Sequence, residues 1–399
     1  MRKQSNDMNS VELVGIIELG ETSKVQFKRE FDNQEKIAAE MIALANSKGG
    51  MLLLGVEDKT GEVVGLDYSN IQKTGNKIST IANELVNPPI YIMTDVVPVS
   101  TGDEVKKVLI VYVEEGVNKP YKDNNGTIWL KQGSDKRKLK ENSEIMRLFQ
   151  QSGNLLADEM AVYGTTIDDI DDRLFTDYFK KEFNRPYQEM KLTYEEALRA
   201  KKVLIGDKVT LAGLLFFGKE SQKFKPAFTI KLVSFAGNDL ANPTYRSKPE
   251  DAKGTIPEVF KQGMLFLKSH LRYRQNGQGF NSIGIPEISP VALEEVLQNA
   301  LVHRDYFKNA PVRVLIFDNR IEIISPGKLP NGLTVEDIKY GNIAIRNYQI
   351  AAYSVHALPY SGLGSGLKRA LELQPDIQFV NDEGGNQFTV IIPRPFCPM

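Results

Sequence analysis

Three polar residues near the end of the chain have the types and the spacing that phosphate chemistry needs. Glu295, Asn299 and His303 stand four residues apart, so one face of a helix presents all three. The asparagine is a neutral oxygen ligand and the glutamate an acidic one, and together they can hold Mg²⁺ and orient a water molecule for nucleotide hydrolysis. The alternative is a solvated helix face that binds nothing.

A glycine-rich segment, SGLGSGL at residues 361–367, leads directly into the helix-forming run KRALEL. Glycines at a helix entrance let backbone N–H groups approach a phosphate, and the helix dipole adds attraction for negative charge. The spacing differs from the Walker A pattern, because no Gly-Lys-Ser/Thr follows. A flexible turn is the alternative interpretation of this segment.

The elements that position these residues follow a defined order. A helix over residues 290–302 carries Glu295 and Asn299, with His303 directly after its last residue, and an Asp-Asn turn joins the two strands that follow. A Pro/Gly loop, a variable stretch, the glycine-rich segment with its helix and a second hairpin follow. The predicted ranges are 312–317 and 320–325 for the first strand pair, 326–332 for the loop, and 376–380 and 387–392 for the second pair.

This order, together with the blocks LEEVLQNALVHRDY, VRVLIFDNRIEIISPGKLPNGLTVEDI and IRNYQIA, resembles a divergent branch of the GHKL (Bergerat-fold, HATPase-like) family, which includes gyrase-type ATPases and histidine kinases. The resemblance implies a C-terminal α/β sandwich that binds ATP and Mg²⁺. It implies that Asn299 binds the metal and that Glu295 activates water. It also implies phosphate contact by three glycines, Gly362, Gly364 and Gly366.

The first glycine loop, which contains Gly327, departs from the pattern of that family. Typical members have an aspartate just before the loop, and its carboxylate accepts a hydrogen bond from the adenine amine. Here Ser325 stands in that place. A hydroxyl can still bond a base but lacks the charge of a carboxylate, so weak ATPase activity and binding without turnover are both open. For Arg304, the alternatives are phosphate contact and an ion pair with Asp305 or another acid.

The N-terminal part resembles a second family. The segments ELGETSKVQFKRE, NSKGG, MLLLGVEDKTGEVVGL and KPYKDNNGTIWLKQGSDKRKL are similar to the AlbA-type domain shared with Schlafen proteins, which binds DNA or RNA. Cations on such a domain neutralise phosphates without base readout, whereas the alternative is a solvated charged face. The candidate nucleic-acid-binding residues are Lys28, Arg29, Lys131, Lys136, Arg137 and Lys138.

Some Schlafen relatives cut RNA with an acidic cluster that holds a divalent metal ion. Glu21 matches the first acid of that cluster and Asp58 the third, but the second position holds Gln26. An amide cannot supply the missing negative charge, so metal binding should be weaker. The domain is therefore expected to bind nucleic acid rather than cut it, with a metal-dependent endoribonuclease as the alternative.

Composition places limits on these hypotheses. The chain has 399 residues, 41% of them hydrophobic and 25% charged, which is typical of a globular protein with two or three domains. A net charge of −1 gives no bulk signature of nucleic-acid binding, so any such contact must use a local basic face. One cysteine excludes an intrachain disulfide, and no segment is long and apolar enough for a membrane span. These features predict a cytoplasmic protein without a membrane partner.

The predicted fold class is α+β, with a Schlafen/AlbA-type α/β domain at 11–150, a connecting α/β region at 155–285 and a GHKL-type domain at 286–396. In the connecting region, residues 210–217 and 228–235 are expected to be strands. The leading hypothesis is a nucleic-acid-binding transcriptional regulator with an ATP-binding module, with DNA or RNA, a nucleotide and a second copy of the chain as partners. A non-catalytic assembly scaffold is a further alternative, motivated by Ser325 and Gln26.

Overall fold

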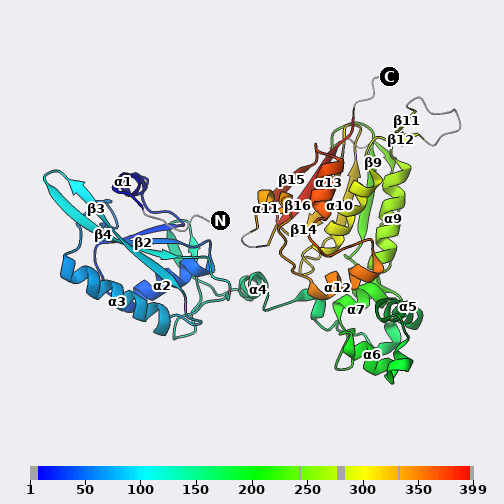
Figure 1. Ribbon diagram of the computed structural model, residues 1–399, viewed down its shortest axis with the longest axis horizontal. Helices are drawn as coiled ribbons and strands as arrows, with labels where there is room; N and C mark the ends of the chain where they lie inside the picture. The colour runs from blue at the N-terminus through cyan, green and yellow to red at the C-terminus, as the bar shows by residue number, and fades with distance from the viewer. Residues whose placement is uncertain (1–7, 242–243, 276–283, 331–332, 396–399) are drawn as a thin grey trace. The chain divides into compact units, whose positions relative to one another are not determined.

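The computed structural model describes residues 8–241, 244–275, 284–330 and 333–395, and the chain divides into two compact units, Met1–Leu155 (unit 1) and Leu156–Met399 (unit 2) (Figure 1). Both units mix helices and sheets, so the fold class is α+β, as predicted. Among the described residues, no helix has both the length and the apolar character that a membrane span requires. Residue 396, the predicted end of the last domain, lies outside the described residues.

Unit 1 is built on a four-stranded sheet in the order β1-β2-β4-β3. β1 runs parallel to β2, and the other neighbours are antiparallel. A two-stranded hairpin, β5-β6, lies beside helix α2. The elements of unit 1 are α1 (Ser10–Glu18), β1 (Val25–Lys28), α2 (Gln34–Asn46), β2 (Gly50–Leu54), α3 (Tyr68–Glu84), β3 (Ile92–Thr101), β4 (Glu104–Val113), β5 (Trp129–Gln132), β6 (Asp135–Lys138) and α4 (Asn142–Gln151).

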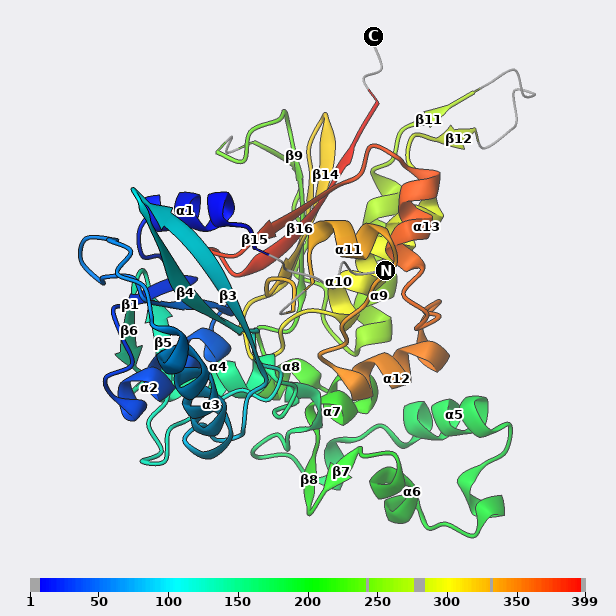
Figure 2. The ribbon, with the colours of Figure 1, turned by 60° about the vertical axis from the view of Figure 1, so that its left-hand side comes forward.

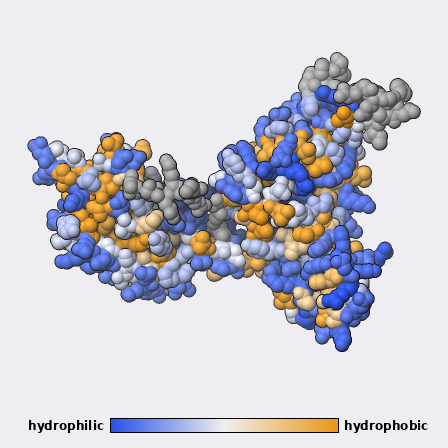
Figure 3. All heavy atoms as spheres, viewed as in Figure 1, coloured by the Kyte–Doolittle hydropathy of each residue, from blue (hydrophilic) through white to orange (hydrophobic). Residues whose placement is uncertain are grey.

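The two faces of this sheet carry separate cores. On one face, α2 and α3 pack on apolar side chains of β2 and β4, and nearly every residue of α2 is buried. On the other face, α1 packs on alternate residues of the same strands, as the two-residue period of a strand requires. At the β3–β4 hairpin the sheet reaches solvent: Met93, Val96 and Val105 are exposed, and hydrophobic residues colour this surface orange in Figure 3.

Unit 2 is built on a six-stranded sheet in the order β10-β9-β13-β14-β16-β15. β9 runs parallel to β13, and the remaining neighbours are antiparallel. Helices α9, α10 and α13 cover one face, and α10 packs against both of the others. These elements are β9 (Ile230–Phe235), β10 (Tyr245–Ser247), α9 (Ile256–Ser269), α10 (Pro290–Val302), β13 (Val312–Ile316), β14 (Arg320–Pro326), α11 (Val335–Lys339), α12 (Tyr348–Ala357), α13 (Gly366–Leu373), β15 (Gln378–Asp382) and β16 (Gln387–Pro393).

A helical part completes unit 2 and packs against α12 (Figure 2). Its elements are η1 (Ala157–Glu159), η2 (Ile167–Asp169), α5 (Asp172–Phe183), η3 (Tyr187–Met190), α6 (Tyr194–Ala200), β7 (Leu204–Ile205), β8 (Lys208–Val209), α7 (Leu211–Phe217) and α8 (Ser221–Phe224), with the short strands β11 (Tyr273–Arg274) and β12 (Ile285–Pro286) after α9. The strand predicted for 210–217 is wrong, because α7 occupies it. All seven residues of α7 are buried, and a short run that is apolar on every side carries no periodicity to separate strand from helix.

The regions predicted as 155–285 and 286–396 lie together in unit 2. β9, from the first region, pairs over residues 230–234 with the whole of β13, from the second. α9 likewise packs on α10, and a single hydrophobic core runs from Ala157 to Ile392. The sheet that supports the C-terminal elements therefore depends on a strand and a helix that precede residue 286.

A buried ion pair fixes the end of β16. The guanidinium of Arg394 donates to Oε1 of Glu287 at 2.6 and 2.9 Å and to the carbonyls of Phe317 and His270 at 2.8 and 3.0 Å. The Arg394 side chain is 3% exposed and the Glu287 side chain 2%. This one cation thereby ties β16 to the end of β13, to the end of α9 and to the segment after β12.

We expect Arg394→Met to destabilise unit 2 by about 3–5 kcal/mol, because the Glu287 carboxylate would stay buried without its cation. Urea unfolding followed by far-UV circular dichroism measures the loss. The only tryptophan, Trp129, lies in unit 1, so its fluorescence is an internal control that should not change. Adding Glu287→Leu should restore much of the stability, and an unchanged unit 2 transition in the single variant would contradict the assignment.

Candidate functional site

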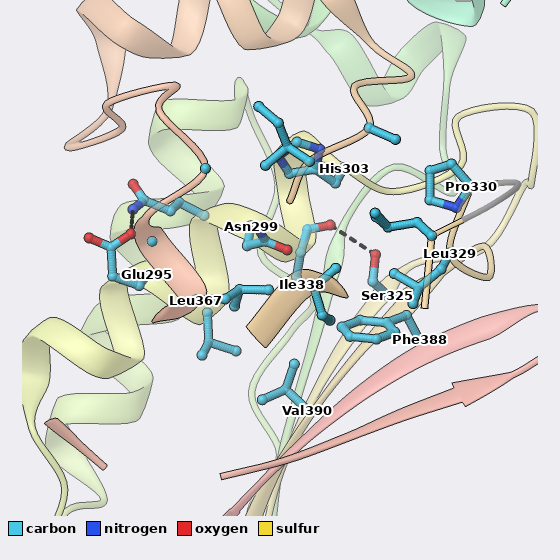
Figure 4. A pocket seen from close by; sticks show the side chains of 18 of the residues that line it. Glu295, Asn299, His303, Ser325, Leu329, Pro330, Ile338, Leu367, Phe388 and Val390 are labelled. Carbon is cyan, nitrogen blue, oxygen red and sulfur yellow. Dashed lines mark hydrogen bonds between the residues drawn. The ribbon is translucent and has the colours of Figure 1, made fainter. Parts of the chain in front are cut away.

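A pocket opens in unit 2 between α10, the sheet and two loops (Figure 4). It encloses about 940 Å³ of space between atoms, counted together with the solvent at its mouth, and apolar side chains from β14 and β16 form its floor. Concave, largely apolar sites with a few polar groups are typical of small-molecule binding. The structure brings all of the predicted nucleotide-site residues to this pocket: Glu295, Asn299, Ser325, Gly327, Gly362, Gly364 and Gly366.

Helix α10 positions the polar triplet. Its apolar residues pack into the main core, which leaves Glu295, Asn299 and His303 on the side that faces the pocket. Asn299 is half-buried, and within the described residues its carboxamide makes no hydrogen bond. A carboxamide at a pocket wall can bind a metal ion through its oxygen or donate a hydrogen bond to a ligand through its NH2 group.

Glu295 has partners in this conformation. It forms an ion pair with Arg369 of α13 and accepts a hydrogen bond from Nε2 of Gln298 at 2.7 Å. Its side chain is 7% exposed. A carboxylate held by a guanidinium and an amide is not available as a base, so Glu295 is poised for water activation only when Arg369 moves away. No pattern in the sequence indicates that Arg369 pairs with Glu295.

Ser325 also has a partner. Its hydroxyl donates to the carbonyl of Ala300 at 3.0 Å and is almost fully buried (Figure 4). The hydroxyl proton is therefore used within the protein, and only oxygen lone pairs remain for a ligand. A ligand group at this wall must accordingly be a donor to contact Ser325.

The second glycine loop offers backbone donors. Within the residues described, the N–H groups of Gly362, Gly364 and Gly366 find no acceptor. Gly366 begins α13, so the positive end of the helix dipole lies at the same wall. Unpaired N–H groups at a helix N-terminus suit an anion. Gly327 of the first loop differs, because its N–H already donates to the carbonyl of Asn386 at 2.9 Å.

His303 forms a neutral wall of the pocket. Its Nε2 lies 3.1 Å from the hydroxyl of Tyr360. Burial, assisted by the positive charge of Arg346, lowers the pKa of His303 to about 4. The imidazole is therefore uncharged at neutral pH and adds no cation to the pocket.

Arg304 fulfils neither of its two expected roles. Its guanidinium is buried between the rings of Phe228 and Tyr306, 4.6 and 4.8 Å from their centroids, and donates to the carbonyls of Lys308 and Ala310. It contacts neither the pocket nor the Asp305 carboxylate. Two aromatic rings and two backbone carbonyls are the partners of this cation, while its Nε makes no hydrogen bond among the described residues. Sequence spacing does not reveal these contacts.

In unit 1, the acids predicted for metal binding have other partners. Glu21 accepts hydrogen bonds from the Gln26 amide and, at 2.8 Å, from the backbone N–H of Phe27. Asp58 forms an ion pair with Lys28 at 2.6 Å. Throughout the described ranges, no three His, Cys, Asp or Glu side chains come together in a group that could hold a metal ion.

The expectation that Lys131 contacts nucleic acid is wrong, because its side chain is only 1% exposed. Its ammonium donates to Oε1 of Gln26 at 2.6 Å and to the carbonyl of Ser134, and it lies 3.8 Å from Glu40. Burial lowers the pKa of this lysine. Lys131 is thus an internal counter-charge, placed beside the position where the relatives' second acid would stand.

The other predicted cations of unit 1 lie at the surface, and they differ in whether a carboxylate pairs with them. Arg29 pairs with Glu57 and Arg137 with Glu144, while Lys136 pairs with the buried Glu40. Lys138 is exposed, and in the described part of the chain it has no carboxylate partner. Its ammonium lies 5.3 Å from the ring centroid of Trp129, its cross-strand neighbour. The β5–β6 hairpin thus presents an available cation next to an aromatic ring.

Comparisons with known proteins agree with these two units. Residues 21–140 match the family described as "Schlafen, AlbA_2", and residues 309–392 match HATPase_c_4, described as "Putative ATP-dependent DNA helicase recG C-terminal". Residues 146–230 match a domain of unknown function, DUF8451. No curated protein matches the chain.

Among solved structures, the DIP2311 protein from Corynebacterium diphtheriae is similar at 22% identity with a TM-score of 0.45, over 93% of this chain and 75% of that one. The two matched domain types indicate a nucleic-acid-related protein that uses a nucleotide. The chain therefore joins a Schlafen/AlbA_2 domain on its N-terminal side to a HATPase_c_4 domain on its C-terminal side.

Proposed function

We propose that this protein is a nucleic-acid-binding regulator whose C-terminal domain, residues 286–396 with the supporting region 155–285, binds ATP. The observation that carries the nucleotide part is the convergence of unpaired donors on one pocket. The Asn299 carboxamide and the N–H groups of three loop glycines all lie at its wall without partners among the described residues. Residues 11–150 form the nucleic-acid-binding domain in this proposal, and the active species is a homodimer, as in GHKL relatives.

The pocket suits a triphosphate together with Mg²⁺. Mg²⁺ usually takes one or two oxygens from a protein and the rest from phosphates and water, so the single Asn299 oxygen is a sufficient donor. The loop amides and the α13 dipole provide for the phosphate charge. When bound, the metal ion would neutralise that charge.

Turnover in this proposal is weak. Glu295 is the candidate base, but Arg369 and Gln298 hold its carboxylate in this conformation. Water activation requires an uncommitted acceptor. The ion pair of Glu295 with Arg369 must therefore open before each hydrolysis, which favours binding over catalysis.

Unit 1 supports binding to nucleic acid rather than its cleavage. The residues do not fit the metal site of a nuclease, because Gln26 and the Lys131 ammonium stand where negative charge would be needed. No observation in unit 1 favours the endoribonuclease alternative.

The nucleotide proposal predicts that millimolar ATP with Mg²⁺ raises the melting temperature of unit 2. Ligand at a hundredfold excess over Kd stabilises a protein by about 2.7 kcal/mol, which is a shift of several degrees. Asn299→Ala should lose most of that shift, as measured by circular dichroism.

Gln262→Ala is the matched control for this experiment, because Gln262 is an exposed amide on α9 that does not line the pocket. It should keep the full ATP shift, and Trp129 fluorescence should show unit 1 unchanged. Equal shifts in the wild type and Asn299→Ala would remove Asn299 from the site, and no shift in the wild type would end the nucleotide proposal.

The nucleic-acid proposal predicts salt-sensitive binding of single- or double-stranded DNA or RNA through the β5–β6 hairpin. Lys138→Ala should weaken binding about threefold or more at 50 mM salt and reduce the salt slope by about 1. Fluorescence anisotropy with labelled oligonucleotides measures both quantities. Lys73→Ala, an exposed lysine on α3, is the control. Identical affinities for Lys138→Ala and the wild type would show that the hairpin is not the contact.

A further inference from the structure

A cation that the family comparison does not assign lies in the wall of the nucleotide pocket. Residues 340–347, here called the strap, follow α11 and pass between the two glycine loops. On one side, a Cβ on Gly364 would lie 2.8 Å from the Gly341 carbonyl and 2.5 Å from the Ile343 side chain. On the other side, a Cβ on Gly327 would lie 2.8 Å from Nη1 of Arg346. The strap therefore brings the Arg346 guanidinium to the pocket between the loops, and Arg346 is one of its lining residues.

The protein supplies little to compensate this charge. Arg346 donates to the carbonyl of Lys328, and it forms no ion pair with any residue that the structure describes. The carboxylate whose field acts on it is Asp305, which accepts from the backbone N–H of Phe307 at 2.9 Å instead. The carboxylate that lines the pocket, Glu295, is held by Arg369.

Arg346 is half-buried, which makes the lack of a counter-charge significant. Desolvation lowers the pKa of Arg346, but a guanidinium keeps its proton in proteins. A partly desolvated cation without an anion is unfavourable, because it has lost part of its water and no carboxylate pairs with it. The neighbouring His303 is neutral and Lys328 is cationic, so neither supplies the missing negative charge.

The first glycine loop is shaped around this guanidinium. Gly327 has φ +103°, and any side chain there would meet Arg346 and the Asp305 side chain, with Cβ–Cβ at 2.4 Å for the latter. The positive φ and the Asp305 Cβ require glycine at position 327, and the missing side chain leaves room for Nη1 of Arg346, independently of any ligand contact by Gly327 itself.

We propose that Arg346 binds a phosphoryl group of the pocket's ligand and supplies, from the strap, the cation that recognises it. The inference deepens the proposed function and rests on it for the identity of the ligand as a nucleotide. The binding of a phosphoryl group does not rest on it, because that follows from the residues at the pocket wall. A planar guanidinium presents two parallel N–H donors to two phosphoryl oxygens, which Lys cannot reproduce. Together with the amides of the second glycine loop, it makes the pocket wall a site for an anion rather than for a neutral base alone.

Isothermal titration calorimetry with three probes tests this assignment: ATP with Mg²⁺, sodium tripolyphosphate without metal, and adenosine. Arg346→Gln should weaken ATP and tripolyphosphate at least tenfold and leave adenosine unchanged, while Arg346→Lys should recover only part of the loss. Arg173→Gln, on the exposed face of α5, is the matched control and should bind all three probes as the wild type does. If Arg346→Gln binds ATP and tripolyphosphate with the same affinities as the wild type does, the proposal is overturned.

The pKa of His303 gives a readout that does not depend on a well-folded Arg346 variant. The chain has three histidines, so their ring signals can be resolved by NMR. The groups that face His303 are Arg346 and the Tyr360 hydroxyl. An anion that binds Arg346 offsets its field, so tripolyphosphate should raise the pKa of His303 in the wild type from about 4. A pKa that does not move when saturating tripolyphosphate is bound would overturn the proposal.

These outcomes separate the inference from the nucleotide function. Binding of tripolyphosphate that depends on Arg346, with no ATP binding that depends on Asn299, would support the phosphoryl site and reject the nucleotide. ATP binding that depends on Asn299 but is unchanged by Arg346→Gln would support the nucleotide function and reject the phosphoryl site at Arg346.

Discussion

The close approach of α13 to α10 determines the form of the pocket. A Cβ on Gly366 would lie 2.5 Å from Oε2 of Glu295, so a side chain at this position would displace the carboxylate from the first turn of α13. This contact sets the position of the unpaired loop amides and allows Arg369 to reach Glu295. Both helices are anchored in the main core, α10 along its apolar face and α13 through Leu367 and Ala370. Binding geometry and the state of the candidate base therefore depend on the same helix contact.

Helical spacing and the resemblance to the GHKL family together predicted residues that line the pocket. The four-residue spacing of Glu295 and Asn299 is a property of one helix, and the glycine loops follow in a fixed order. The partners of these residues were not predictable in the same way. Arg369 lies 74 residues after Glu295, and Arg346 reaches the pocket through a strap without regular structure. Such contacts depend on how helices and loops pack, which periodicity does not encode.

The cations of the β5–β6 hairpin, residues 131–138, likewise show that a sequence does not reveal which charges are paired within the fold. Lys131 and Lys136 are directly opposite in the β5–β6 hairpin, a like-charge pair that is unfavourable unless a counter-charge lies near. Glu40 of α2 supplies it, at 3.8 Å from Lys131 and 2.5 Å from Lys136. Two residues further along the same strand, Lys138 remains exposed. A run of cations in a sequence thus contains residues with opposite roles, and the strand's position against α2 decides between them.

Two buried cations and one half-buried cation of this protein illustrate how structural and ligand-binding charges differ. Lys131 is balanced by a carboxylate and an amide, and Arg304 by two aromatic rings and two carbonyls. Neither lines the nucleotide pocket, and the partners of both come from the protein itself, although Nε of Arg304 makes no hydrogen bond among the described residues. Arg346 has one carbonyl partner at the wall of a pocket. The same electrostatic rule, that a desolvated cation requires compensation, therefore assigns the first two to stability. It leaves the counter-charge of the third to whatever molecule enters the pocket.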